Sequence, residues 1–290
     1  MKTTTQKAYA KLNISLDVTD KRPDGFHNMV MVMQSISLAD DISITLNDSG
    51  IVRARTSLHF IPNDERNLAV RAAVRYLKEI GDSEHGAEIE IKKRVPVGAG
   101  MGGGSSDAAA VLRGMNALFD YRVSGERLVE ISGDIGSDVP FCVVGGTALA
   151  EGRGEILTPL PDFPACAFVV CKPEFSISTP ELFKKLDMQK THHHPDTAGI
   201  IEALHAGALQ PLCRRMFNVF ESMDDRRMRD VARIKSALLD NGALGAVMTG
   251  TGSAVFGIFA DVDTASRACE ALKKDIPFCC TAVPTGRETV

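Results

Sequence analysis

The amino-acid sequence predicts an α+β protein with two domains. Apolar and polar residues alternate with a period of two in several segments, as in half-buried strands, while other segments carry apolar residues at helical spacing. Both patterns occur on each side of a proline-rich stretch, Thr158–Pro164, which is typical of a connector. A chain of 290 residues also exceeds one typical domain. We therefore expect one domain over residues 1–157 and a second over residues 158–290.

The first half alternates predicted strands with predicted helices. Residues 10–19 alternate regularly enough to predict a half-buried strand, with Lys11 and Asn13 on its polar face. Further alternation indicates an antiparallel or mixed sheet. These strand-like segments are residues 29–38, 41–46, 51–55 and 87–95. The expected helices cover residues 67–81, a segment from near Ser105, and a segment after a Ser124 cap, and residues 136–155 then return toward a strand.

The second half predicts a smaller α+β unit. Residues 165–173 and 278–284 are strand-like, and residues 245–261 predict a strand, a turn and a second strand. Helical spacing predicts helices over residues 178–186 and 264–275. Two or more further helices are expected after the polar stretch at residues 187–197, up to about Asp240. This order of elements is typical of a small α+β sandwich.

Composition and charge exclude several classes of protein. A formal net charge of −4 argues against a large nucleic-acid surface, which needs concentrated basic residues. Seven cysteines without a CxxC pair indicate reduced thiols rather than a disulfide scaffold or a zinc ribbon. No apolar run has the length of a membrane span, and the N-terminus has no hydrophobic signal core. We therefore expect a cytoplasmic protein that binds neither nucleic acid nor membrane.

The most informative motif is a run of five glycines and two serines over Gly98–Ser106, directly before a predicted helix. Glycines let backbone N–H groups approach a phosphate closely, and the helix N-terminus adds unpaired amides and a positive dipole end. A flexible linker is the simplest alternative. The run also matches GxGxxG, but it follows an alternating strand rather than a buried parallel one, and it lacks the lysine of a Walker motif. The motif therefore predicts a site for a phosphate-bearing ligand.

Three segments together resemble the GHMP kinases, the superfamily of galactokinase, homoserine kinase, mevalonate kinase and phosphomevalonate kinase. They are residues 96–110 (PVGAGMGGGSSDAAA), 7–29 (KAYAKLNISLDVTDKRPDGFHNM) and 246–257 (AVMTGTGSAVFG). The resemblance implies a ribosomal protein S5 domain 2-like ATP-binding domain, then a ferredoxin-like α+β domain, with the active site in the cleft between them. Within the superfamily, AKLN followed by RPDGFH resembles members that phosphorylate the 2-hydroxyl of a cytidine-diphosphate-linked methylerythritol in the non-mevalonate isoprenoid pathway.

The resemblance implies ATP and Mg²⁺ as cofactors, and it assigns Lys11 and Asp138 as the catalytic pair. Asp138 would act as general base, and Lys11 would stabilise charge on the acceptor oxygen. Taken alone, Asp138 is equally well a helix N-cap before Pro140, and Lys11 a solvated strand residue. The positions that match the ATP site are Asn67 and Lys93 on the adenine side, with Pro96, Gly98, Gly100, Gly102, Gly103, Gly104, Ser105 and Ser106 around the phosphates. The Ser106 hydroxyl is the candidate Mg²⁺ ligand.

The resemblance also implies a substrate site for a small nucleotide-linked molecule. Phe26 and Phe183 match two aromatics that stack cytosine, although the first is often Tyr, and His27 matches the residue that recognises the base edge. Each has a simpler explanation, since Phe183 fits a helix core position and His27 a surface turn. The remaining positions are Asn13, Asp138 and Thr179, with Gly250, Thr251, Gly252 and Ser253 as a second cradle or, alternatively, a tight turn.

Other functions fit parts of the same sequence. Another small-alcohol kinase of the superfamily, for homoserine or mevalonate, would not need RPDGFH or the paired phenylalanines. A non-catalytic ligand sensor on this scaffold would not need both Lys11 and Asp138, and a dinucleotide-dependent oxidoreductase is supported only by GxGxxG. The run His192–His194 suggests a metal site, but a solvated loop fits its polar surroundings better. We expect a monomer or a homodimer.

Overall fold

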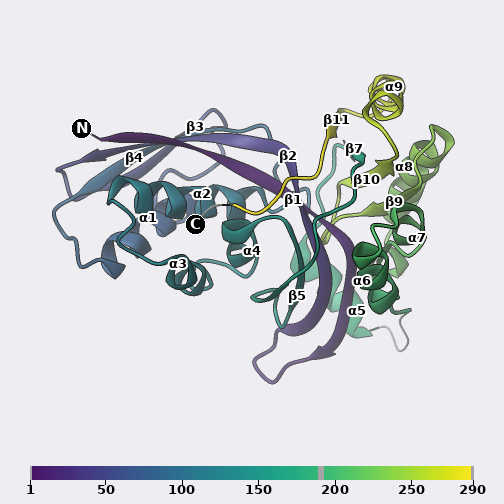
Figure 1. The fold of residues 1–290 in the computed structure, drawn as a ribbon, viewed down its shortest axis with the longest axis horizontal. Coiled ribbons are helices and arrows are strands. Elements are labelled where there is room, and N and C mark those ends of the chain that lie inside the picture. Colours follow the sequence, from purple (N-terminus) through teal and green to yellow (C-terminus); the bar gives the residue numbers. More distant parts are fainter. Residues whose placement is uncertain (1, 189–192, 289–290) are drawn as a thin grey trace.

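Two β-sheets organise the residues that this computed structural model describes, 2–188 and 193–288 (Figure 1). The first contains β1 (Thr3–Lys21), β2 (His27–Asn47), β3 (Val52–Thr56), β4 (Gly86–Lys92), β5 (Thr147–Glu151), β6 (Ile156–Pro159) and β8 (Phe217–Asn218). The second contains β7 (Ala167–Lys172), β9 (Gly245–Met248), β10 (Val255–Phe259) and β11 (Phe278–Ala282). The predicted α+β class is confirmed.

Helices cover the sheets from outside. They are α1 (Leu68–Glu79), α2 (Gly103–Leu118), α3 (Gly125–Ser132), α4 (Val139–Val144), α5 (Thr179–Met188), α6 (Thr197–His205), α7 (Leu209–Cys213), the 3₁₀ helix η1 (Val219–Ser222), α8 (Met228–Asp240) and α9 (Val262–Leu272). Helices α1 to α4 lie on one side of the first sheet, and α8 and α9 lie beyond the second (Figure 1). Helix α2 is central, because it packs on β1 and β2 and contacts both α1 and α4.

The first sheet runs in the order β3-β4-β2-β1-β8, with β5 beside β2 and β6 beside β5. Strand β2 pairs antiparallel with β1 from Thr3↔Thr45 to Lys21↔His27. The two strands that alternation predicts over residues 29–38 and 41–46 are therefore one continuous strand, because the long partner β1 supplies a ladder across the gap between them.

Two further elements differ from the sequence-based expectation. Residues 139–144 form helix α4, where the glycines favoured a return toward a strand, and Pro140 stands in its first turn, where proline is tolerated. Helix α2 begins at Gly103, before Ser105, because Gly102 has φ = +69° and ends the loop there. Ser124 caps α3 as expected, with its side chain accepting a hydrogen bond from the Arg127 amide.

The second sheet is antiparallel in the order β11-β7-β10-β9 and is buried on both faces. On one face of β7, Val169 joins a cluster that includes Leu238 of α8. On the other face, Phe168 joins a cluster that includes Leu12 and Ile14 of β1. Alternate side chains of one strand thus connect the outer helices to the first sheet.

The two halves of the chain are interleaved. Strand β8 comes from the second half but pairs in parallel with Ser15 and Leu16 of β1. After β11 the chain returns to the first half, where Pro284 bridges Ile36 and Arg287 bridges Gly145. Strand β6 spans residues 156–159, so it carries the chain within the first sheet across the predicted boundary after residue 157. The division at that residue stays a prediction.

No helix among residues 2–188 and 193–288 is long and apolar enough to cross a membrane.

A buried amide in the helical layer provides a test of the fold. Asn116 of α2 accepts hydrogen bonds at its Oδ1 from the Tyr76 hydroxyl at 3.0 Å and from the Val123 amide at 3.1 Å, and it donates to the Val123 carbonyl at 2.9 Å. We expect Asn116→Ala to lower the free energy of unfolding by about 1–3 kcal/mol, because it leaves buried polar groups without partners. Urea denaturation measures this. Tyr76→Phe is the control and removes only one bond, so an equal loss in both variants would contradict the account.

Candidate active site

Strand β1 places Lys11 and Asn13 together in the interior. The pairing of β1 with β2 shifts register between Tyr9 and Lys11 and again between Asn13 and Ser15, so an irregularity flanks the pair on each side. Lys11 is 4% exposed and Asn13 is fully buried, and the Lys11 Nζ donates to the Asn13 Oδ1 at 2.7 Å. The expectation that both side chains share one face is confirmed, but that face is not solvated.

Asp138 stands at the N-terminal end of α4 and faces Lys11. Its Oδ2 lies 3.5 Å from the Lys11 Nζ. Although Asp138 occupies the N-cap position, its side chain makes no capping hydrogen bond to the helix within the described part of the chain. The structure therefore separates the two explanations of this residue, since its carboxylate is directed to a lysine rather than to the first turn of α4.

The glycine loop leads into the N-terminus of α2. Gly98, Gly100 and Gly102 all have positive φ, between +64° and +74°, a conformation that side chains disfavour. No side chain of residues 2–188 or 193–288 caps α2, and the first amides of a helix have no partner within it. The loop and the helix end therefore present the amide donors and the positive dipole end that an anion-binding site requires, and phosphate binding here stays a prediction.

The second glycine segment, between β9 and β10, packs directly on the first. The Ala254 amide donates to the Ala99 carbonyl at 3.1 Å. A Cβ on Gly250 would lie 2.8 Å from the Gly100 carbonyl oxygen. The two loops thus meet backbone to backbone, which only glycine permits at these positions.

These parts surround one cavity of about 240 Å³. Its lining combines the predicted catalytic pair, both glycine loops and part of the predicted base site. The predicted residues that line it are Lys11, Gly98, Gly100, Gly102, Asp138, Thr179, Phe183, Gly250, Thr251 and Gly252, and the other lining residues include Leu16, Met29, Met31 and Ile177. The lining includes the polar side chains of Lys11 and Asp138 and the apolar ring of Phe183, as a ligand with both kinds of group requires.

Lys93 belongs to a buried ion-pair network beneath the glycine loop. Its Nζ lies 2.6 Å from the Asp40 Oδ2 and 2.7 Å from the Asp107 Oδ2, and all three side chains are nearly inaccessible. Burial lowers the pKa of Lys93, but the two carboxylates outweigh it and raise that pKa. Burial, reinforced by Asp40 and opposed by Lys93, raises the pKa of Asp107 to about 7. A Cβ on Gly103 would lie 3.4 Å from this ammonium, so the network supports the start of α2.

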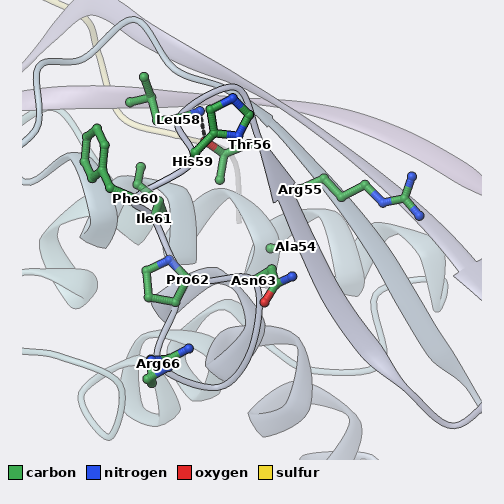
Figure 2. A pocket seen from close by; sticks show the side chains of 10 residues that line it. All are labelled: Ala54, Arg55, Thr56, Leu58, His59, Phe60, Ile61, Pro62, Asn63 and Arg66. Atoms are coloured by element: carbon green, nitrogen blue, oxygen red, sulfur yellow. Dashed lines mark hydrogen bonds between the residues drawn. The ribbon is translucent and has the colours of Figure 1, made fainter.

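Asn67 begins α1, directly after the loop that lines a second cavity of about 530 Å³, but it does not itself line that cavity (Figure 2). Its Oδ1 accepts the Ala69 amide at 3.0 Å as a cap, and its Nδ2 donates to the Pro62 carbonyl at 2.8 Å. Asn67 therefore anchors the loop that carries much of the lining, which consists of residues 54–56, 58–63 and 66. The next residue, Leu68, lies 3.6 Å from a Cβ placed on Gly104, so the start of α1 contacts the glycine loop.

The predicted base site is only partly assembled. The rings of His27 and Phe183 are stacked, with centroids 4.7 Å apart, and the His27 Nε2 is 2.7 Å from the Asp187 Oδ1. Phe26 is 53% exposed and does not line the cavity that contains Lys11 and Asp138. The Arg153 guanidinium lies 5.2 Å from the centre of its ring. The structure thus places His27 against Phe183 and leaves Phe26 outside, and the cytosine stack between the two phenylalanines stays a prediction.

Hydroxyl groups at the site have backbone or mutual partners. The Ser106 Oγ donates to the Gly103 carbonyl at 3.0 Å, and the Ser253 Oγ to the Phe175 carbonyl at 2.5 Å. The Thr179 and Thr251 hydroxyls lie 2.8 Å apart and join the start of α5 to the second glycine loop. Ser253 is fully buried, so its hydrogen bond to Phe175 supports that loop from the interior of the protein.

Neither His193 nor His194 of the histidine run lines this cavity. His192 is outside the described residues, His193 is exposed, and the His194 Nδ1 lies 3.0 Å from both carboxylate oxygens of Asp17. No group of three or more His, Cys, Asp and Glu side chains among residues 2–188 and 193–288 is arranged to hold a metal ion.

Sequence reasoning missed several residues that hold the site together, all of them buried except Asp187. Thr249 and Asn218 support the second glycine loop, Asp40 and Asp107 neutralise Lys93, and Asp187 fixes His27. The sequence did contain a signal for Thr249, because this residue begins the TGTGS segment. The others are ordinary polar residues in sequence, and only their burial or their partners distinguish them.

The architecture and the site define a class of protein. The family model "GHMP kinases N terminal domain" matches residues 67–146, and "GHMP kinases C terminal" matches residues 200–277. The first match covers the glycine loop and Asp138, and the second covers the other glycine loop. The chain belongs to the GHMP kinase family, whose members are ATP-dependent kinases.

Its relatives carry one particular name. A protein of Clostridium perfringens named 4-diphosphocytidyl-2-C-methyl-D-erythritol kinase is 45% identical over 92% of each chain, and one of Bacillus velezensis with the same name is 45% identical over 87% of each. The solved structure "Crystal structure of 4-(cytidine 5'-diphospho)-2C-methyl-D-erythritol kinase" matches with a TM-score of 0.81 and 32% identity. That match covers 98% of this chain and 100% of the solved one.

The contact between the glycine loops predicts which glycine is indispensable. A Cβ on Gly100 would lie 2.2 Å from the Thr249 carbonyl oxygen, at a φ of +74°. We expect Gly100→Ala to cost about 2 kcal/mol or more in unfolding free energy, because this buried contact cannot expand. Gly104→Ala is the control, since its Cβ meets only Leu68 at 3.6 Å. Thermal or urea unfolding compares the two, and similar losses would contradict the close packing.

The ion-pair network predicts a large difference between two neighbouring lysines. Lys93→Met leaves Asp40 and Asp107 buried without a cation, so we expect a loss of about 3–5 kcal/mol in unfolding free energy. Lys92 is exposed, and Lys92→Met should change stability by less than about 0.5 kcal/mol. Urea denaturation at neutral pH measures both. A stable Lys93→Met protein would show that the network does not support the fold.

Proposed function

We propose that this chain transfers the γ-phosphoryl group of ATP, with Mg²⁺, to the 2-hydroxyl of 4-diphosphocytidyl-2-C-methyl-D-erythritol. The single observation that carries the proposal is the Lys11–Asp138 pair, 3.5 Å apart, in a cavity bordered by both glycine loops. The relatives' shared name supports the acceptor. The reaction is a step of the non-mevalonate pathway to isoprenoid precursors.

The geometry supports a simple division of roles in the transfer. Asp138 accepts the proton of the substrate hydroxyl as its oxygen forms a bond to the γ-phosphorus, while the bond from that phosphorus to the oxygen of the departing ADP breaks. The Lys11 ammonium, held by Asn13, neutralises charge on the acceptor oxygen. The amides at the start of α2 hold the transferring phosphate. These roles together position the reactants and balance the charge.

The arrangement also supports a place for each end of ATP. The triphosphate would lie along the glycine loop from Gly98 to Ser106, and the adenine would enter the cavity lined by residues 54–56, 58–63 and 66, in the segment before Asn67 (Figure 2). Because both polar ends of the Asn67 side chain are engaged, this residue would act indirectly, by holding the loop that lines the pocket. Lys93 would act indirectly, by supporting the first turn of α2.

The oxygen donors near the loop fit a shared Mg²⁺ ion. Mg²⁺ that is bound by a triphosphate needs only one or two protein oxygens. The Ser106 hydroxyl stands at the start of α2, and the Asp107 Oδ1 in the next position is buried without a hydrogen-bond partner among the described residues. When bound, the ion would neutralise negative charge on the β- and γ-phosphates.

Other functions have weaker support. The homoserine kinase structure from Cytophaga hutchinsonii shares the fold with a TM-score of 0.78 but only 22% identity, so it supports no choice of acceptor. A ligand sensor would not need the Lys11–Asp138 pair. A coupled ADP-release assay with the cytidine conjugate, homoserine and mevalonate tests the proposal. We expect turnover with the cytidine conjugate alone, and no turnover above background would refute the assignment.

Replacing the proposed base gives the sharpest mechanistic test. Asp138→Asn keeps the size of the side chain but cannot accept a proton, so we expect kcat to fall by at least about 10²-fold. ATP affinity, measured by calorimetry, should change little. Asp134→Asn is the control, because the Asp134 side chain is exposed and follows the C-terminus of α3. An unchanged kcat in Asp138→Asn would show that Asp138 only begins helix α4.

A further inference from the structure

Thr249 joins the two glycine loops to the catalytic strand, although it does not line the cavity. Its side chain is completely buried at the end of β9, just before Gly250. A ligand in the cavity therefore cannot contact its hydroxyl, and any effect on chemistry must pass through another residue.

The Thr249 hydroxyl has three partners, on β1 and on the first glycine loop. Its Oγ1 accepts the backbone N–H of Asn13 at 3.1 Å. The same oxygen lies 3.2 Å from the Gly100 carbonyl and 3.3 Å from the Asn13 Oδ1, either of which can accept its one proton. A single buried hydroxyl thus bridges β1, the loop before α2 and the loop after β9.

From Asn13 the contacts continue to the catalytic pair. The Asn13 Oδ1 accepts the Lys11 Nζ at 2.7 Å, and the same ammonium lies 3.5 Å from the Asp138 Oδ2. The Lys11 amide in turn donates to the Met101 carbonyl at 3.0 Å, in the first glycine loop. Lys11 is therefore oriented by groups that Thr249 holds in place on two sides.

Asn218 fixes the backbone on both sides of Thr249. Its Nδ2 donates to the Met248 carbonyl at 2.7 Å and to the Gly250 carbonyl at 2.8 Å, which are the residues on either side of Thr249. Its Oδ1 accepts the Phe220 amide at 3.0 Å. Asn218 is buried in β8, the short strand that pairs with β1, so it links Thr249 to the same strand a second time.

We propose that Thr249 is a positioning residue for the phosphoryl transfer, which acts through Asn13 on Lys11 and is itself held by Asn218. This inference rests on the proposed function for its kinetic consequence, but not for its structural one. Every member of the connection is buried and makes specific hydrogen bonds, so it has little freedom to adjust. A displacement of about 1 Å at a catalytic group can cost as much as about 10²-fold in rate.

Two substitutions at Thr249 separate the hydroxyl from the shape of the side chain. Thr249→Val keeps the volume and removes the hydroxyl, and we expect kcat to fall by about 10- to 100-fold with little change in KM for ATP. Thr249→Ser restores the hydroxyl and should retain most of the wild-type kcat. Combining Thr249→Val with Asn13→Ala should cost no more than Asn13→Ala alone, because both act through one contact. Equal losses in Val and Ser, or additive losses in the double variant, would overturn the proposal.

A measurement without substrate tests the contact itself. In protein labelled with ¹⁵N-asparagine, with the Asn13 signal assigned by its loss in Asn13→Ala, Thr249→Val should shift the Asn13 backbone amide upfield and speed its hydrogen exchange. Thr249→Ser should not. An unchanged Asn13 amide in Thr249→Val would overturn the proposal whatever the activity, whereas absence of wild-type turnover would overturn only the proposed function. If Thr249→Val does not fold, Asn218→Asp turns a donor into an acceptor against two carbonyls and should produce the same shift.

Discussion

The active site depends on the direct contact between two glycine loops that lie far apart in the sequence. The carbonyl oxygen of Thr249 would lie 2.2 Å from a Cβ placed on Gly100, and the Gly100 carbonyl oxygen would lie 2.8 Å from a Cβ placed on Gly250. Since a Cβ at either position would clash with the other loop, the two backbones are in direct contact. This contact brings the end of β9 against the loop before α2 and so places amides from both halves of the chain around one cavity.

Two lysines near this contact illustrate how burial separates support from chemistry. The charge of Lys93 is neutralised inside the protein by two carboxylates, those of Asp40 and Asp107. Lys11 has one carboxylate at 3.5 Å and one amide oxygen at 2.7 Å, and it lines the cavity. An ammonium with spare hydrogen-bonding capacity beside a cavity can respond to charge that develops on a ligand, while one enclosed by two carboxylates mainly holds its neighbours in place.

The interleaving of the two halves has a consequence for the substrate side. Strand β8 brings Asn218 to β1, and α5 brings Asp187 to the hairpin formed by β1 and β2, where it pairs with both Lys21 and His27. Phe183, which lines the cavity, thereby contacts the same hairpin through the stacked His27 ring. The residues proposed to bind the acceptor and those proposed to bind the phosphate are thus carried by one connected framework, in which β1 is the common element.

The sequence by itself determined the α+β class, the order of most strands and helices, and the residues with distinctive local chemistry. Alternation placed Lys11 and Asn13 on one face, and the glycine runs marked both loops, because strand periodicity and positive-φ glycines are local properties. It did not determine that residues 29–38 and 41–46 form one strand or that 139–144 is a helix, since pairing with β1 and packing against α2 decide those. The supporting residues Thr249, Asn218, Asp40 and Asp187 were decided only by the tertiary structure. Their importance comes from partners distant in sequence and from burial, and a single polar residue carries no local signal of either.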